Sequence, residues 1–302
     1  MPLKLAAARA DITRMPLRPP ACACLVAVAA FLWVGSAAAG VGASRVAALQ
    51  VGLGARGLYS GTIDGVAGPS TAAAVRAFQR RAHLQVDGIA GPRTRAALGR
   101  YGRHTLGSRP LAARAFGWDV AELQFLLAWH GFPSGPFDGR LGLRSARALR
   151  RFQRYAGLRA DGVAGAGTFA ALRAPLLRVP ISLAWPLRGP IGSGFGPRGS
   201  GFHAGVDVIA PAGAPVAAAA SGRVVWAGYR AGGWGLLVTI AHGSGVRTMY
   251  AHLSRVGVRV GERVGVGERV GRVGATGDAD GPHLHFEVRL RSAAVDPLPA
   301  LR

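Results

Sequence analysis

The sequence predicts a multidomain protein of the α plus β class, in which two small three-helix units precede a compact antiparallel β domain. Three observations support this prediction. Residues 44–99 and 118–173 are related by a constant offset of 74 residues, helical periodicity is lost after about residue 183, and five of the eight histidines fall between positions 203 and 285. The chain has 302 residues, half of them apolar, so it is long enough to bury several cores.

The two N-terminal units are identified by identities that keep one register without a gap. The aligned pairs are Leu49-Gln50 with Leu123-Gln124, Asp64-Gly65 with Asp138-Gly139, Phe78-Gln79 with Phe152-Gln153, and Asp87-Gly88 with Asp161-Gly162. Chance does not place so many identities in one frame, so the region is an internal repeat.

Each repeat is predicted to contain three helices. Apolar residues recur at helical spacing in two segments, in the first copy Val46, Leu49 and Leu53, then Val75, Phe78 and Ala82. Cap-type residues mark the expected starts of the second and third helices: Thr71 and Ser145, then Thr94 and Thr168. The Asp-Gly pairs predict turns, because glycine tolerates a positive φ and aspartate bonds its local backbone.

A change of composition separates the repeats from the C-terminal part of the chain. Residues 174–190 are predicted to be a linker that contains four prolines, Pro175, Pro180, Pro186 and Pro190. Beyond them, β-branched or alternating segments such as 222–227, 236–240 and 285–290 are separated by glycines. An antiparallel β domain is therefore expected over residues 183–300.

Residues 1–39 have the pattern of an export signal peptide. A basic start precedes an apolar run from Ala21 to Val34 and small residues up to Ala39, after which we expect cleavage. An uncleaved membrane anchor is the alternative, but the run is shorter than the roughly 20 residues of a spanning helix. A chain started at Met15 would carry a more compact signal. We expect a secreted protein of the cell wall or periplasm, without a stable membrane span after cleavage.

Removal of this segment changes both the cysteine content and the charge. Cys22 and Cys24 lie in the apolar run, so the processed chain would hold any metal through nitrogen and oxygen. It would keep 33 basic and 13 acidic residues, a net charge of +20. Such a surface attracts a polyanion. An exported chain without a nucleic-acid motif points to an anionic cell wall and not to nucleic acid.

The repeats resemble the three-helix peptidoglycan-binding domain of bacterial wall enzymes. The shared order is Leu-Gln, Asp-Gly, Gly-Pro, Phe-Gln and Asp-Gly, and the first copy keeps both Gly68-Pro69 and Gly91-Pro92. The second copy has Leu143 and Ala166 at the proline positions, which leaves open whether it still binds. The resemblance implies peptidoglycan as a partner, although the recurring residues themselves are typical of core and turn positions.

The clustered histidines suggest a metal site. His283 and His285 are two residues apart and share one face of a strand, while His203 and Asp207 are four apart with Gly205 disfavouring a helix between them. A catalytic zinc takes three protein ligands and leaves one position open. Two histidines and one carboxylate would suffice, and the remaining histidines would then transfer protons near neutral pH. The spacing does not say which histidine binds and which catalyses.

Residues 198–298 resemble the lysostaphin-type zinc endopeptidases, family M23. Three motifs carry the resemblance: His203-Ala-Gly-Val-Asp207, Tyr250-Ala-His252-Leu253 and Gly281-Pro-His283-Leu-His285-Phe-Glu287. Position by position, the resemblance implies that His203, Asp207 and His285 hold Zn²⁺. It also implies that His252 and His283 are a catalytic pair that does not bind the metal. They would share the base role and oxyanion stabilisation in peptide hydrolysis, in an order that the resemblance leaves open.

Three further residues are candidates for substrate contact, and two of them have a structural alternative. Tyr250 shares the face of His252 on a strand, with core packing as the alternative. Arg198 is a candidate partner for a substrate carboxylate. His242 precedes Gly243, so it is also a candidate for ordering a turn. Glu287 continues the alternation of His283 and His285 and is either a residue that orients a ligand or an ordinary surface glutamate.

The sequence therefore predicts a zinc-dependent endopeptidase of peptidoglycan, tethered by two wall-binding repeats. A non-catalytic wall-binding regulator of another hydrolase is the alternative, but such relatives typically lack metal ligands and this chain keeps all three. A basic protein that coats an anionic polymer would leave the ordered histidines unexplained. The sequence predicts no oligomeric state.

Overall fold

The structure is a computed structural model that describes residues 41–302. These residues lie in one compact unit. The predicted export signal at 1–39 falls outside the described residues. Within residues 41–302, no helix combines the length and the apolar character needed to cross a membrane.

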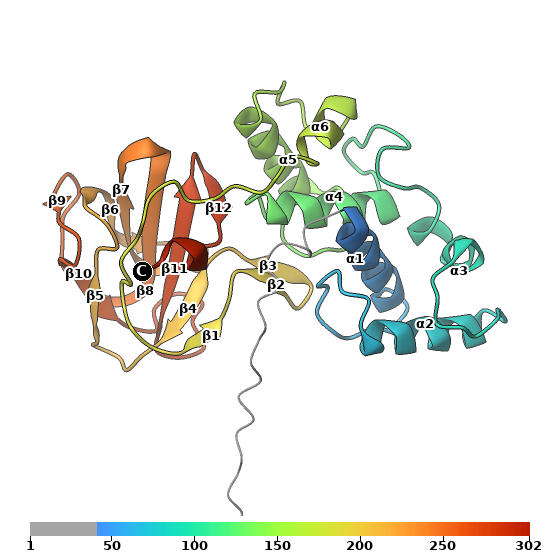
Figure 1. The fold of residues 1–302 in the computed structure, drawn as a ribbon, viewed down its shortest axis with the longest axis horizontal. Coiled ribbons are helices and arrows are strands. Elements are labelled where there is room, and N and C mark those ends of the chain that lie inside the picture. The colour runs from blue at the N-terminus through green and yellow to red at the C-terminus, as the bar shows by residue number, and fades with distance from the viewer. Residues whose placement is uncertain (1–40) are drawn as a thin grey trace, which may run out of the picture. The chain divides into compact units, whose positions relative to one another are not determined.

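Helices make up the first part of the described chain (Figure 1). The first repeat contains α1 (Val41–Gly54), α2 (Pro69–Arg81) and α3 (Pro92–Ala97), followed by a short 3₁₀ turn at Gly99–Tyr101. The second contains α4 (Trp118–Trp129), α5 (Leu143–Tyr155) and α6 (Ala166–Ala171). The prediction of three helices in each repeat is thus confirmed. Helices α1 and α4 pack against each other, and their apolar residues share one core that includes Leu53 and Phe125.

The Asp-Gly signature belongs to a hydrogen-bond network that occurs twice in each repeat. Gln50 Nε2 donates to Asp64 Oδ1 (2.7 Å) and to Thr71 Oγ1 (3.1 Å), and Gln50 Oε1 accepts from the amide of Gly65 (3.0 Å). Gly65 has a φ of +75°, a backbone conformation that residues with a side chain rarely adopt. The other three networks join Gln79, Asp87 and Thr94; Gln124, Asp138 and Ser145; and Gln153, Asp161 and Thr168. Each buried glutamine therefore ties a helix to the turn beyond it.

These networks correct the predicted helix starts. The cap position of α2 is Gly68, so Thr71 lies inside the first turn, and its hydroxyl donates to the carbonyl of Val66 (3.0 Å). The other three predicted starts also lie inside the first turn: Thr94 in α3, Ser145 in α5 and Thr168 in α6. The hydroxyls serve the glutamine networks because glycine already provides the extended backbone at each cap.

The second part is an antiparallel β domain (Figure 1). Its strands are β1 (Ile191–Ser193), β2 (Gly196–Arg198), β3 (Gly201–His203), β4 (Val206–Ile209), β5 (Pro215–Ala217), β6 (Gly222–Arg230), β7 (Gly235–Ala241), β8 (Val246–Val256), β9 (Arg263–Val264), β10 (Arg269–Val273), β11 (His283–Leu290) and β12 (Ala293–Val295). The main sheet has the order β1-β4-β11-β8-β7-β6-β9, while β2 and β3 form a separate hairpin. Every pairing between these strands is antiparallel, as the sequence predicted.

Alternation along the central strands places apolar residues in the core and polar residues at the site. Leu284 and Phe286 of β11 are fully buried between neighbours of β4 and β8. Leu183 is also buried in this core, and its amide donates to the carbonyl of Ala300 (2.9 Å). The last part of the predicted linker 174–190 therefore belongs to the β domain.

Candidate metal centre

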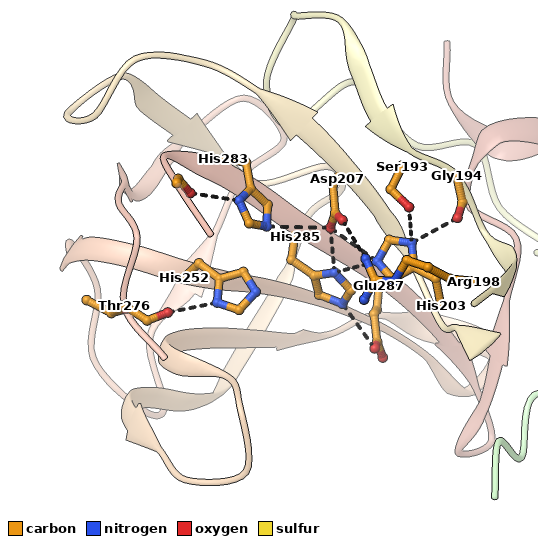
Figure 2. A network of polar contacts seen from close by, with 11 residues as sticks. Ser193, Gly194, Arg198, His203, Asp207, His252, Thr276, His283, His285 and Glu287 are labelled. Atoms are coloured by element: carbon orange, nitrogen blue, oxygen red, sulfur yellow. Dashed lines mark hydrogen bonds and ion pairs between the residues drawn. The ribbon is translucent and has the colours of Figure 1, made fainter. Parts of the chain in front are cut away.

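Strand register brings three predicted ligands together. His285 of β11 lies opposite Asp207 of β4, and His203 ends β3 just before β4 begins. His285 Nδ1 is 2.8 Å from Asp207 Oδ1 and 3.0 Å from His203 Nε2, and His203 Nε2 is 3.1 Å from Asp207 Oδ1 (Figure 2). Three atoms that bind metals thus meet at one point, and all three residues are buried.

The donor set fits Zn²⁺. Zinc takes nitrogen and carboxylate oxygen ligands at about 2.0–2.2 Å in a tetrahedral arrangement, which separates the ligand atoms by about 3.3 Å. The observed separations of 2.8, 3.0 and 3.1 Å are close to that value. Three protein ligands leave a fourth position for water or substrate.

Gly205 allows this close packing. A Cβ atom at this position would meet the carbonyl oxygen of Phe286 and lie 3.1 Å from Cε1 of His285. The glycine between His203 and Asp207 therefore lets β4 approach β11 closely enough for the ligands to meet.

The pKa shifts of the ligands reflect their proximity. Burial acts to raise the pKa of Asp207, but hydrogen bonds and charge interactions with His203 and His285 outweigh it and hold that pKa well below its usual range. Burial acts to lower the pKa of His285, but the carboxylates of Asp207 and Glu287 raise it to about 9. The buried carboxylates therefore favour positive charge at this point.

Glu287 contacts the ring nitrogen of His285 that faces away from Asp207 and His203. His285 Nε2 lies 3.2 Å from Glu287 Oε1, and Arg289 Nη2 is 2.7 Å from Glu287 Oε2. Glu287 is only 3% exposed, so it is not an ordinary surface glutamate, and the alternative of a residue that orients a ligand describes it correctly. Burial acts to raise the pKa of Glu287, but His285 and Arg289 lower it, which keeps the carboxylate charged.

His252 and His283 lie beside the three ligands (Figure 2). Their rings are 4.8 Å apart, and His283 Nε2 is 3.7 Å from Asp207 Oδ1. Each contacts a backbone carbonyl through Nδ1. His252 contacts the carbonyl of Thr276 (2.8 Å), and His283 contacts the carbonyl of Gly281 (2.9 Å). A neutral ring that donates through Nδ1 has an unprotonated Nε2. Both histidines can therefore accept a proton at Nε2.

The backbone of His252 is in an uncommon conformation. Its φ is +60°, although it lies within strand β8 and has a Cβ atom. Its amide donates to the carbonyl of Trp234 (3.1 Å), so two backbone groups fix the residue from both sides. Such strain is concentrated at functional sites.

Two contributors to the site were missed by sequence reasoning. Thr276 supplies the carbonyl for His252, and its hydroxyl donates to the carbonyl of Leu253 (2.8 Å). Trp234 packs edge to face against His285, with ring centroids 5.7 Å apart. The segment Gly274-Ala-Thr-Gly277 offered a signal for Thr276, whereas no spacing in the sequence linked Trp234 to the histidines.

The three candidates for substrate contact have different positions. Arg198 Nη1 lies 3.2 Å from Asp207 Oδ2 and its side chain is 60% exposed, so it lies at the edge of the site. Tyr250 is fully buried, and its hydroxyl accepts from the amide of Ala219 (2.8 Å). The predicted contact of Tyr250 with substrate is thus wrong, because the side chain is part of the core.

His242 stabilises a turn away from the ligands. Its Nδ1 lies 2.8 Å from the carbonyl of Ser221 and its Nε2 lies 2.8 Å from Thr248 Oγ1. Burial lowers the pKa of His242, which favours the neutral ring. Within the described residues it contacts none of the five site residues, so the structure supports the turn alternative over a substrate contact.

Both repeats contact the β2–β3 hairpin, which ends at His203. The amide of Ile63 donates to the carbonyl of Gly199 (2.9 Å), and that of Phe137 donates to the carbonyl of Ser200 (2.6 Å). The ring of Trp129 packs edge to face against Phe202, with centroids 5.3 Å apart. Residues next to His203 are therefore held by the repeats as well as by the β domain.

The described residues combine two helical repeats with an antiparallel β domain that carries a candidate metal site of two histidines and one aspartate. Residues 201–297 belong to peptidase family M23, and residues 42–98 and 117–172 match a family of peptidoglycan binding domains. Peptidoglycan is thereby supported as a partner, and the cell envelope as the location.

Two curated proteins are similar to about a third of the chain. The chain is 44% identical over 114 residues to the cell division protein DipM of Caulobacter vibrioides, which covers 37% of this chain and 19% of DipM. It is 47% identical over 97 residues to the DD-carboxypeptidase/endopeptidase Mpg of Neisseria meningitidis, which covers 32% of this chain and 22% of Mpg. The matched region thus spans about a fifth of the length of these curated relatives.

A solved structure is also similar to part of the chain. The catalytic domain of lysostaphin from Staphylococcus simulans is 38% identical, with a TM-score of 0.35, and the match covers 37% of this chain and 90% of that domain.

Proposed function

We propose that this protein is an exported, zinc-dependent endopeptidase that hydrolyses peptide bonds in bacterial peptidoglycan and is tethered to it by its two repeats. One observation carries the proposal: ligand atoms of His203, Asp207 and His285 meet within 2.8–3.1 Å, beside two histidines with an available Nε2.

His203, Asp207 and His285 would hold the zinc. When bound, zinc polarises a scissile carbonyl and lowers the pKa of a water molecule. His252 and His283 would share the remaining work. One would accept the proton of the attacking water at Nε2 and pass it to the leaving amine. The other would stabilise the oxyanion as a donor in its protonated form, in which Nε2 carries a hydrogen.

Arg198 would bind a carboxylate of the substrate. Its guanidinium is largely exposed, and it reaches the edge of the site through a single 3.2 Å contact with Asp207. A guanidinium has five donors, so a single contact leaves most of them available to a carboxylate. Peptide stems of the wall carry such groups.

The decisive experiment measures new amino groups and soluble peptides released from purified peptidoglycan by the processed protein, residues 40–302. A chelated sample, a sample reloaded with zinc, and the His252→Ala variant are compared, and His83→Asn in the first repeat is the control. We expect release that chelation abolishes and zinc restores. We expect His252→Ala to reduce the rate at least about 100-fold, and His83→Asn to leave it unchanged.

The opposite result would favour a regulator. If a folded, zinc-loaded protein sediments with peptidoglycan but releases no amines, the endopeptidase proposal fails and wall binding remains. Mass spectrometry of released peptides would identify the bond that is cleaved.

A further inference from the structure

Four arginines surround a groove at the end of β8 that lies outside the metal centre. The groove has a volume of about 640 Å³ and is lined by Arg255, Arg259, Arg269, Arg272 and Glu262, together with backbone of the segments between them. Strands β8 and β10, which carry three of the arginines, are neighbours in the sheet (Figure 1).

The strand register forces two of these positive charges together. Arg255 of β8 lies directly opposite Arg272 of β10 in an antiparallel pair. Opposed side chains in such a pair have Cβ atoms about 4.5–5.5 Å apart, and like charges placed there destabilise the sheet. A bound anion would relieve this repulsion.

Few acidic groups in the described part of the chain neutralise these arginines. None of the four arginines forms an ion pair with any residue in the range 41–302. Glu262 is the one carboxylate of the lining, and its Oε2 accepts a hydrogen bond from the amide of Arg259 (2.8 Å). The lining therefore keeps a net charge of about +3 from four guanidinium groups and one carboxylate.

One of the arginines is held in place before any ligand arrives. Arg272 is half-buried, and its Nη1 donates to the carbonyl of Gly213 (2.8 Å). Arg255, Arg259 and Arg269 are exposed, with side chains free to turn toward a ligand. A fixed guanidinium flanked by adaptable ones is suited to a ligand with several anionic groups.

We propose that this groove binds a linear polyanion whose oxyanion groups, phosphate or carboxylate, are closely spaced. Guanidinium groups pair with both kinds of oxyanion through parallel hydrogen bonds. A groove of several hundred cubic ångströms accommodates a ligand much larger than a single anion. Its hollow form suits a polymer strand better than a flat lipid surface.

The groove and the candidate metal centre share one strand. Arg255 comes three residues after His252 on β8, which corresponds to about 10 Å along an extended strand. None of the five site residues lines the groove. This inference concerns the groove alone and does not require peptidase activity.

The test measures binding of the processed protein, residues 40–302, to linear polyphosphate, with polyglutamate as a second probe and phosphatidylglycerol vesicles as a third. The variant Arg255→Gln/Arg272→Gln is compared with Arg188→Gln/Arg247→Gln, which removes the same charge from positions outside the groove. We expect the groove variant to bind polyphosphate at least about tenfold more weakly, with a salt dependence reduced by about two counterions. The control should stay within about twofold.

Thermal unfolding provides a second measurement. Polyphosphate should raise the unfolding temperature of the wild-type protein and of the control, because a ligand stabilises the state that it binds, but not that of the groove variant. If loss of the Gly213 contact unfolds the groove variant, Arg255→Gln/Arg259→Gln replaces it, since both of these side chains are exposed.

The probes separate the sources of the ligand. Tighter binding of polyphosphate than of polyglutamate would identify the ligand as a phosphate polymer. Tighter binding of polyglutamate would identify it as a carboxylate polymer. Either result supports the proposal. Equal weakening in both variants would overturn it in favour of diffuse attraction to a basic surface. Binding that depends on Arg255 and Arg272 only with vesicles would overturn it in favour of a membrane surface.

Discussion

Glu287 stands directly behind His285, with Oε1 of the carboxylate 3.2 Å from Nε2 of the imidazole. The other ring nitrogen, Nδ1, lies 2.8 Å from Asp207 and 3.0 Å from His203. A histidine whose Nε2–H donates a hydrogen bond to a carboxylate has an Nδ1 lone pair available for a metal, and the carboxylate raises the basicity of the ring. The contact with Glu287 favours the tautomer of His285 that a metal at Nδ1 would need.

Replacement of Glu287 by Gln should therefore weaken metal binding. We expect zinc affinity to fall about 10–100-fold, because the amide does not favour the Nδ1 lone pair as the carboxylate does. Competition with a chromophoric chelator measures this affinity independently of any peptidase activity. The exposed Glu268→Gln is the matched control and should bind zinc as the wild type does. Unchanged affinity in Glu287→Gln would exclude this role.

Single replacements should have different effects on zinc affinity at the proposed metal ligands and at the proposed catalytic histidines. His203→Ala removes one of the three converging atoms and should lower zinc affinity together with activity. His252→Ala should keep zinc affinity within a few-fold and lower kcat at least about 100-fold, because it removes a proton acceptor and no ligand. Zinc titration and amine release on the same samples distinguish the two. Equal loss of zinc from both variants would contradict the assignment.

The second repeat should become more stable when it regains a proline of the first. Leu143 opens α5 after Gly142, as Pro69 opens α2 after Gly68, and both glycines are extended. As the first residue of its helix, Leu143 has an amide without a helical acceptor, so proline loses nothing there. We expect Leu143→Pro to raise the free energy of unfolding by about 0.4–1 kcal/mol. Denaturant titration measures it, with Leu143→Ala as the control for loss of the exposed side chain.

His130 should make the second repeat sensitive to acid. Burial lowers the pKa of His130, and its bond to the carbonyl of Leu172 (3.0 Å) offsets this only in part. The folded state therefore binds fewer protons than the unfolded chain below about pH 6.5, the ordinary pKa of histidine. The free energy of unfolding contributed by this group then falls as pH falls, and it is restored above that pH.

His130→Asn tests this dependence. Unfolding curves between about pH 7.5 and pH 5 should show a smaller loss of stability for the variant than for the wild type. The control is His83→Asn, with asparagine chosen because the φ of +53° at this position suits it. An identical pH dependence in all three proteins would show that His130 does not contribute.

Repetition made the helical region predictable. Two copies at one offset revealed the residues that both copies keep. The structure places two of them, Gln50 and Asp64, in one hydrogen-bond network. The predicted cap at Thr71 was wrong because a local rule cannot distinguish a hydroxyl that caps a helix from one that serves a distant glutamine. That difference depends on a partner 21 residues away.

The sequence alone predicted the fold class and the repeats, because periodicity and offset are properties of the chain. Through the motifs of the M23 resemblance it also predicted the five residues that the structure brings together. Only the tertiary structure decided the environment of each side chain. Tyr250 continues the alternation of His252 and Glu287 that of His285, yet Tyr250 lies in the core and Glu287 contacts His285. The physical reason is that burial and hydrogen-bond partners come from adjacent strands, and strand register brings together residues far apart in sequence.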